Sequence, residues 1–246
     1  MQIGPAAAAR VALLAGLTVF LAAPSRAVPA TTLDVYENTV LLGSLNAAQL
    51  NCADGPPGTA SCQIFNVTFG DLRIDSAGIG LFEDPEIDTS LGVTNLSGAT
   101  QRFTLVFTMS VTSIPGATLT GGSTEFDFGD NTGDGVTLAA PAGSALYTAQ
   151  IDGGNYQALF PFPASGGDPT PFGGGTMGTA SFGTPIPSQA GPAVTTSIGI
   201  QYDFTLTGGD DASSSTGKFV VKPVPEPSTA LLLGIGLAAF AVVRRR

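Results

Sequence analysis

A run of acidic residues near the middle of the chain has the oxygen groups that calcium prefers. The run FDFGDNTGDGV contains Asp127, Asp130 and Asp134, with Asn131 and several glycines between them. Calcium binds hard oxygen ligands, and extracellular calcium modules often bind it weakly. The run is not an EF-hand loop, because no glutamate follows at the twelfth position. It predicts a low-affinity Ca²⁺ site, and the alternative is an acidic hairpin turn without a ligand.

A second acidic group, LFEDPEID, contains Glu83, Asp84, Glu86 and Asp88. Two carboxylates can serve a glycosidase as the acid and as the nucleophile or base. Glycosidase sites generally also use aromatic residues that stack on sugars, and the chain has no Trp and only four Tyr. The chain also has no His, which excludes a Ser-His-Asp triad and an imidazole metal ligand. We therefore expect a solvated strand edge here and a protein that is not an enzyme.

The charge balance excludes another class of partner. Residues 28–224 contain 18 acidic and four basic residues, a net charge of −14. Binding to nucleic acid needs clustered Lys and Arg to neutralise the phosphates. We therefore expect no nucleic-acid partner, and the charge fits a self-repelling exported domain or a cation binder.

The two cysteines of the chain, Cys52 and Cys62, flank a loop that contains the sequence GPPG. An exported chain with two cysteines is expected to pair them. Closing so short a loop would stabilise the fold by about 2.5–3 kcal/mol in the chain-entropy model. A redox or metal site is the weaker alternative, because the spacing is not C-x-x-C and no His is available.

Several segments of the chain alternate between apolar and polar residues, which predicts strands with one buried face. The clearest strands are expected at residues 102–112 and 197–207. Shorter strands are expected at residues 64–69, 87–93, 124–128, 146–151, 156–160 and 218–221. Many short strands with glycine-rich turns indicate an all-β fold, an antiparallel β-sandwich of immunoglobulin-like or jelly-roll type. We expect one such domain over residues 28–223.

Residues 161–193 depart from this rhythm, since they contain seven Pro and eight Gly. Such a composition predicts a long loop or linker rather than a regular sheet. Phe162, Phe172 and Phe182 recur in it at intervals of ten residues. We interpret them as anchors that hold the loop on the sandwich, and the alternative is an aromatic surface that contacts a polymer or a partner.

The N-terminus has the three parts of a secretory signal peptide. Arg10 precedes an apolar run at residues 11–23, and Ser25 and Ala27 are the small residues before a cut after Ala27. The apolar run is shorter than the roughly 20 residues that span a bilayer. We therefore predict that signal peptidase removes residues 1–27 after the secretion machinery has exported the chain.

The C-terminus has a different three-part pattern. It consists of Val224, Pro225, Glu226 and Pro227, an apolar stretch at residues 229–243, and then Arg244, Arg245 and Arg246. The apolar stretch would make a short transmembrane helix of about 22 Å, and arginines that follow it stay on the cytoplasmic side. The whole pattern resembles the PEP-CTERM sorting signal of exported proteins in Gram-negative bacteria that make extracellular polysaccharide.

This resemblance implies a destination and a processing partner for residues 224–246, and no activity for the rest of the chain. An exosortase, a multi-pass membrane enzyme, would cut near the motif after transient anchoring in the inner membrane. The protein would then reach the cell surface or the extracellular space. We expect a structural or matrix-associated protein linked to exopolysaccharide or biofilm. The alternative is a carbohydrate- or calcium-binding surface module.

Overall fold

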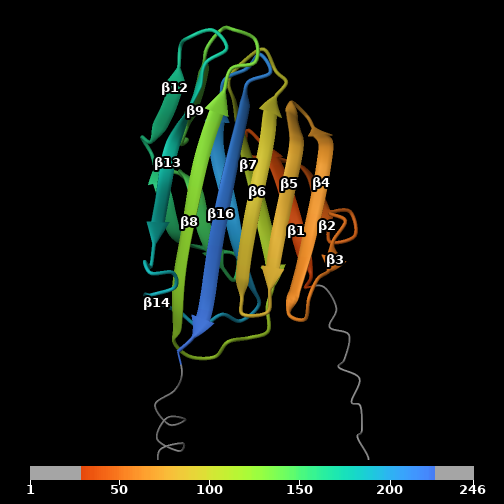
Figure 1. Cartoon of the computed structure of the whole chain (residues 1–246), viewed down its shortest axis with the longest axis vertical. Helices are drawn as coiled ribbons and strands as arrows, with labels where there is room; N and C mark the ends of the chain where they lie inside the picture. Colours follow the sequence, from red (N-terminus) through yellow and green to blue (C-terminus); the bar gives the residue numbers. More distant parts are fainter. Residues whose placement is uncertain (1–28, 225–246) are drawn as a thin grey trace, which may run out of the picture.

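The computed structural model describes residues 29–224, which form two antiparallel sheets packed face to face (Figure 1). These residues contain strands and turns and no helix, so no helix that could cross a membrane occurs among them. The sequence prediction of an all-β antiparallel sandwich is confirmed. The predicted signal peptide lies outside the described residues, and so does the C-terminal pattern from Pro225 onward, which includes Glu226, Pro227, the apolar stretch and the three arginines.

The front sheet faces the viewer in Figure 1 and has eight strands. From one edge to the other they are β13 (Gly174–Phe182), β8 (Thr118–Gly129), β16 (Ala212–Pro223), β6 (Glu86–Asn95), β5 (Leu72–Phe82), β4 (Thr59–Phe69) and β3 (Ala53–Asp54), and β14 (Gln189–Gly191) also pairs with β8. All of these pairs are antiparallel.

The back sheet also has eight strands. Its main path is β11 (Gly154–Pro161), β10 (Ala145–Ile151), β15 (Ser197–Leu206), β7 (Gln101–Ser110), β1 (Thr31–Glu37) and β2 (Val40–Asn46), and β9 (Val136–Ala139) joins β15 to β12 (Ser165–Asp168). The two strands that the sequence indicated most clearly, β7 and β15, are neighbours at the centre of this sheet.

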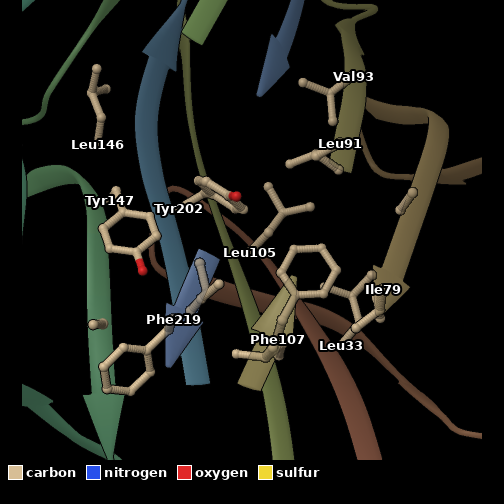
Figure 2. Close-up of a cluster of buried hydrophobic side chains, with 14 of the residues drawn as sticks. Leu33, Ile79, Leu91, Val93, Leu105, Phe107, Leu146, Tyr147, Tyr202 and Phe219 are labelled. Atoms are coloured by element: carbon tan, nitrogen blue, oxygen red, sulfur yellow. The ribbon is translucent and has the colours of Figure 1, made fainter. Parts of the chain in front are cut away.

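The core lies between the sheets and follows the predicted alternation. Inward residues of β7 and β15, such as Phe107 and Tyr202, are completely buried, and their rings meet edge to face with centroids 6.0 Å apart. Figure 2 shows these residues beside Ile79 and Leu91 of the front sheet. The Tyr202 hydroxyl lies 2.6 Å from the hydroxyl of Thr89 on β6, so the ring spans the core and its polar end is satisfied. Burial raises the pKa of Tyr202 well above its usual range.

The expectation of a long loop over residues 161–193 is wrong, because this segment contains β12, β13 and β14. Two of its glycines, Gly166 and Gly175, lie in strands against the ring of Phe128. A Cβ on Gly166 would come within 2.6 Å of the ring of Phe128, and one on Gly175 within 3.0 Å. Close backbone approach to a ring requires glycine at these positions, so a glycine-rich composition is compatible with strands here.

The three phenylalanines of this segment do not share one role. Phe182 is 8% exposed and packs in the core near Phe219, as an anchor would. Phe162 and Phe172 are 54% and 71% exposed. The interpretation as anchors is therefore correct for Phe182 and wrong for the other two, because their neighbours leave most of each ring uncovered.

The two ends of the sandwich differ in what they contain. Strand β1 begins and β16 ends toward the lower end in Figure 1, so the chain enters and leaves the described domain there. The upper end contains the turn after β8 and the turn between β15 and β16. Asp130 and Asp134 lie in the first of these two turns, and Asp211 lies in the second.

Candidate functional site

The register of two front strands brings together acidic residues that are far apart in the sequence. β8 and β16 pair from Thr118 opposite Pro223 to Gly129 opposite Ala212. Asp130 directly follows β8 and Asp211 directly precedes β16, so this pairing places the two at the same end. Asp134 lies in the turn that begins at Asp130. One ligand oxygen from each of the three carboxylates lies within 4.8 Å of the other two. We call Asp130, Asp134 and Asp211 the acidic cluster.

Asp130 organises the turn after β8. Its Oδ1 accepts hydrogen bonds from the backbone N–H groups of Thr132 (2.9 Å) and Gly133 (2.7 Å), and its Oδ2 from those of Gly135 (2.9 Å) and Phe172 (3.0 Å). Burial raises the pKa of Asp130, but these four donors outweigh it and lower the pKa to about 2. Asp130 is therefore ionised in any ordinary buffer.

Asp134 and Asp211 have few donors. The Oδ1 of Asp134 accepts a hydrogen bond from the Thr132 hydroxyl at 2.7 Å. Asp211 is 0% exposed, its Oδ2 accepts from the hydroxyl of Thr207, and its Oδ1 is buried with no hydrogen-bond partner. Burial raises the pKa of Asp211, and the negative charges of Asp130 and Asp134 raise it further. Hydrogen bonds from the Thr207 hydroxyl and the backbone N–H of Asn131 lower the pKa, but they do not cancel this rise. Among residues 29–224, the Oδ1 atom of Asp211 is thus a buried carboxylate oxygen without a hydrogen-bond partner.

Asp127 does not belong to this cluster, which corrects the metal ligands expected from the sequence. Side chains alternate along β8, and Asp127 is exposed on the outer face of the front sheet. There it lines a shallow groove of about 290 Å³ with Glu125 and hydroxyl residues that include Ser90, Ser214 and Thr216. The third carboxylate of the cluster is that of Asp211 instead. Asp211 is far from the other two in the sequence, and the register of β8 with β16 brings it to them.

The second acidic group is divided between a turn and a strand. Glu83 and Asp84 lie in the turn before β6, whereas Glu86 and Asp88 lie on β6 and form ion pairs with Lys218 of β16. The expectation of a solvated strand edge is wrong for the latter two, because β6 lies between β16 and β5 inside the sheet. Burial lowers the pKa of Lys218, but its two carboxylate partners outweigh this and raise it.

The predicted disulfide is present between Cys52 and Cys62. Cys62 lies on β4 with 1% of its surface exposed, and Cys52 lies in the turn before β3. The bond joins this turn to an outer strand of the front sheet. Its position fits the structural role expected from the sequence.

Sequence reasoning missed a buried ion pair on the outer face of the back sheet. Tyr202 and Phe204 point into the core, so Asp203 between them points outward, yet its side chain is only 2% exposed. Arg102 on β7 covers it, with Nε donating to Oδ1 at 2.9 Å and Nη2 to Oδ2 at 2.6 Å. The hydroxyls of Thr104 and Ser144 donate to the same carboxylate. This bidentate contact raises the pKa of Arg102.

A further aspartate that the sequence did not single out organises the loop before β15. Asp152 accepts hydrogen bonds from the backbone N–H groups of Thr195, Thr196 and Ser197. Burial raises its pKa, but these donors outweigh it and the pKa falls well below the usual range. Asp152 therefore resembles Asp130 in its role, at a different loop.

Comparison with known proteins identifies the C-terminal end of the chain. Residues 223–246 match the PEP-CTERM protein-sorting motif. The chain carries a PEP-CTERM motif. The match contains all of the sorting residues expected from the sequence, from Val224 to Arg246. No curated protein sequence matches the chain.

The PEP-CTERM motif indicates an exosortase-targeted extracellular protein, exported with a C-terminal membrane-anchoring tail that is processed for the cell surface. Within the structure the motif follows β16 directly. Its Val224 is 38% exposed, and its N–H donates to the carbonyl of Ala117 at 3.1 Å. The fold therefore reaches the first residue of the Val-Pro-Glu-Pro sequence, at the end of the sandwich opposite to the acidic cluster.

Proposed function

We propose that this protein is a non-enzymatic structural component of an extracellular matrix, associated with exopolysaccharide or biofilm. The observation that carries the proposal is the PEP-CTERM motif joined directly to β16. In this role signal peptidase removes residues 1–27, an exosortase processes the tail, and the sandwich is the part that persists outside the inner membrane.

The composition of the sandwich supports this role. Its net charge of −14 over residues 28–224 keeps copies of the domain apart in solution. The Cys52–Cys62 disulfide suits an oxidising compartment. The absence of His removes the commonest general base from the whole chain. These features favour a stable exported module over a catalyst.

The test of sorting is the intact mass of the protein from the culture medium and the envelope of the host. The wild-type mass should begin at about Val28 and end near Pro227. A Glu226→Ala variant should stay in the membrane with its C-terminus complete, and an Asp84→Ala variant, altered in an exposed turn, should behave as the wild type. Secreted wild-type protein that still ends in Arg246 would show that exosortase processing is wrong.

Association with the matrix needs its own experiment. After sorting, the protein should sediment with the extracellular polysaccharide and return to the soluble fraction when the polysaccharide is depolymerised. A protein that is correctly cut but stays fully soluble beside intact polysaccharide would refute the matrix role and leave the sorting assignment in place.

Carbohydrate binding is the second candidate, and the groove on the front sheet favours it. The groove is lined by serine and threonine hydroxyls with two carboxylates, Glu125 and Asp127, which can accept hydrogen bonds from sugar hydroxyls. In affinity electrophoresis through gels that contain the polysaccharide of the host, a Glu125→Ala/Asp127→Ala variant should lose the retardation of the wild type. The Asp84→Ala variant is the control, and equal retardation of all three proteins would exclude the groove.

A further inference from the structure

The acidic cluster is a concentration of negative charge that no basic residue of the described domain compensates. Three of the four basic residues in residues 29–224 are in ion pairs elsewhere: Arg73 with Asp75, Arg102 with Asp203, and Lys218 with Glu86 and Asp88. The fourth, Lys222, is the penultimate residue of β16, at the opposite end of that strand from Asp211. Three carboxylates within 4.8 Å of one another repel strongly unless a cation or a proton joins them.

A second observation points to a missing partner. Asp211 is completely buried, and its Oδ1 is one of the two buried side-chain atoms without a hydrogen-bond partner in residues 29–224. The other, Asp88 Oδ1, lies 3.3 Å from the Lys218 ammonium. A buried carboxylate oxygen without a donor or a cation is costly, and native structures rarely keep one.

The backbone around the cluster keeps the two turns in close contact. Gly209 has a φ of +86°, and a Cβ there would lie 2.9 Å from the Thr132 hydroxyl and 3.2 Å from Oδ2 of Asp134. Asn131 also donates from Nδ2 to the carbonyl of Asp210 at 2.7 Å. The turn after β8 and the turn before β16 are thus held together, and their carboxylates face one another.

We propose that Asp130, Asp134 and Asp211 bind one divalent cation of the calcium type. The ligands are hard oxygens, the protein is exported to a compartment where calcium is abundant, and the negative charge of the three carboxylates attracts a divalent cation. The ion joins the turn after β8 to the turn between β15 and β16. Since β15 belongs to the back sheet and β16 to the front sheet, the ion links the two sheets at the end opposite to the sorting motif.

The first experiment measures thermal unfolding of the full-length chain, purified in detergent and freed of metal with a chelator. CaCl₂ at about ten times the dissociation constant should raise Tm by about 3–6 °C for a domain of this size. Isothermal titration calorimetry should show one site with a dissociation constant in the range of about 10⁻⁴–10⁻³ M, typical of extracellular modules. No change in Tm and no binding heat up to about 10 mM CaCl₂ would overturn the proposal.

Two variants locate the site. Asp211→Asn removes the unsatisfied charge and should weaken calcium binding at least about tenfold, and it should raise Tm in the chelator because the repulsion is relieved. Asp134→Asn alters an exposed residue and should also weaken binding, which keeps the test valid if the buried substitution disturbs folding. Asp127→Asn is the matched control and should bind as the wild type. An unchanged calcium response in both cluster variants would overturn the proposal, as would its loss in the control alone.

The test also separates the cation from a proton as the partner of Asp211. If a proton is the partner, it is bound to the buried oxygen of Asp211 and the group is neutral. Calcium would then not bind there, and Tm would be unchanged at pH 7. A calcium response that increases from pH 5 to pH 7.5 supports the cation, because its carboxylate ligands must be ionised. A protein that is stable at pH 7.5 and indifferent to calcium contradicts it.

Discussion

Two buried aspartates, Asp203 and Asp211, show two ways in which this protein treats a buried charge. Asp203 lies on β15 under a bidentate arginine and accepts two further hydroxyl donors. Asp211 lies eight residues later, its Oδ2 accepts from the Thr207 hydroxyl, its Oδ1 has no hydrogen-bond partner among residues 29–224, and two other carboxylates are its neighbours. The first charge is compensated by Arg102, and no basic residue of the described range 29–224 forms an ion pair with the second. This difference is the basis of the proposal that Asp211 binds a cation, whereas Asp203 stabilises the fold.

The two positions also differ in what surrounds them. Asp203 lies in the middle of a paired strand, where Thr104 of the neighbouring β7 is its direct partner and Arg102 lies opposite Thr205, two residues further along β15. Asp211 lies in a turn at the end of the sandwich, where the backbone of two loops brings the acidic side chains together. In a regular sheet, a residue of the neighbouring strand can pair with a charged side chain. In loops at the end of a sandwich, charged side chains are available to bind ligands.

The largest expected effect is from removing the counter-charge of Asp203. An Arg102→Met substitution keeps much of the apolar contact of the arginine stem but leaves a buried carboxylate without a cation. We expect a loss of about 3 kcal/mol in the free energy of unfolding, measured by urea denaturation at pH 7. The matched control is Arg73→Met, which breaks a half-exposed pair with Asp75 and should cost less than about 1 kcal/mol. Equal costs at the two positions would refute the distinction drawn for Asp203.

The same substitution at the two aspartates should have effects of opposite sign. Asp203→Asn removes the charge that Arg102 requires and should destabilise the protein by about 2 kcal/mol. Asp211→Asn, in the presence of a chelator, should stabilise it by about 1 kcal/mol, because it removes a buried charge from among like charges. Urea denaturation in calcium-free buffer measures both values. Destabilisation by both variants would mean that an unrecognised donor compensates Asp211.

Much of the sandwich follows from local sequence, and the failure to predict β5 has an identifiable cause. β7 and β15 keep a strict period of two, so their buried faces are readable directly. β5 was not predicted because a register shift between Ile74 and Ser76 moves its buried positions by one. The apolar residues then fall out of phase along the strand, and simple alternation is lost.

The cluster was only half predictable, for a reason that lies in topology. Asp130 and Asp134 are close in sequence and were recognised from their spacing. Asp211 is 77 residues beyond Asp134 and reaches it only because β8 and β16 pair in one register. The sequence prediction that Asp127 joins Asp130 and Asp134 is wrong, because alternation along β8 turns the Asp127 side chain to the outer face. Local spacing cannot distinguish these cases without the sheet order.

Acid titration should also separate the two kinds of aspartate, with a smaller effect on stability. The pKa of Asp130 is lowered to about 2, so its contribution is present above the unfolded value of about 3.9 and is lost as the pH falls toward 2. The pKa of Asp211 is raised, so ionisation of this group opposes folding. In calcium-free buffer its unfavourable contribution should therefore disappear as the pH falls through its folded pKa, and be absent below about 3.9.

Melting temperatures between pH 2 and pH 7 test this pattern. Relative to Asp211→Asn, the wild type should gain stability on acidification from pH 7 to about pH 4. Below about pH 4 both proteins should lose stability, because Asp130 and Asp152, whose pKa values are lowered, must be protonated. A constant difference between wild type and variant over the whole range would show that Asp211 does not titrate differently in the folded state.

The smallest expected effect comes from one hydroxyl beside the compensated aspartate. Thr104→Val removes the donor at 3.1 Å from Asp203 Oδ1 with almost no change in shape. Asp203 keeps the two bonds from Arg102 and the one from Ser144, so the carboxylate is still satisfied. We expect a loss of about 0.5–1 kcal/mol in urea denaturation. A loss as large as that of Arg102→Met would mean that the hydroxyl and the arginine act as one network, and that compensation of Asp203 depends on all of its donors together.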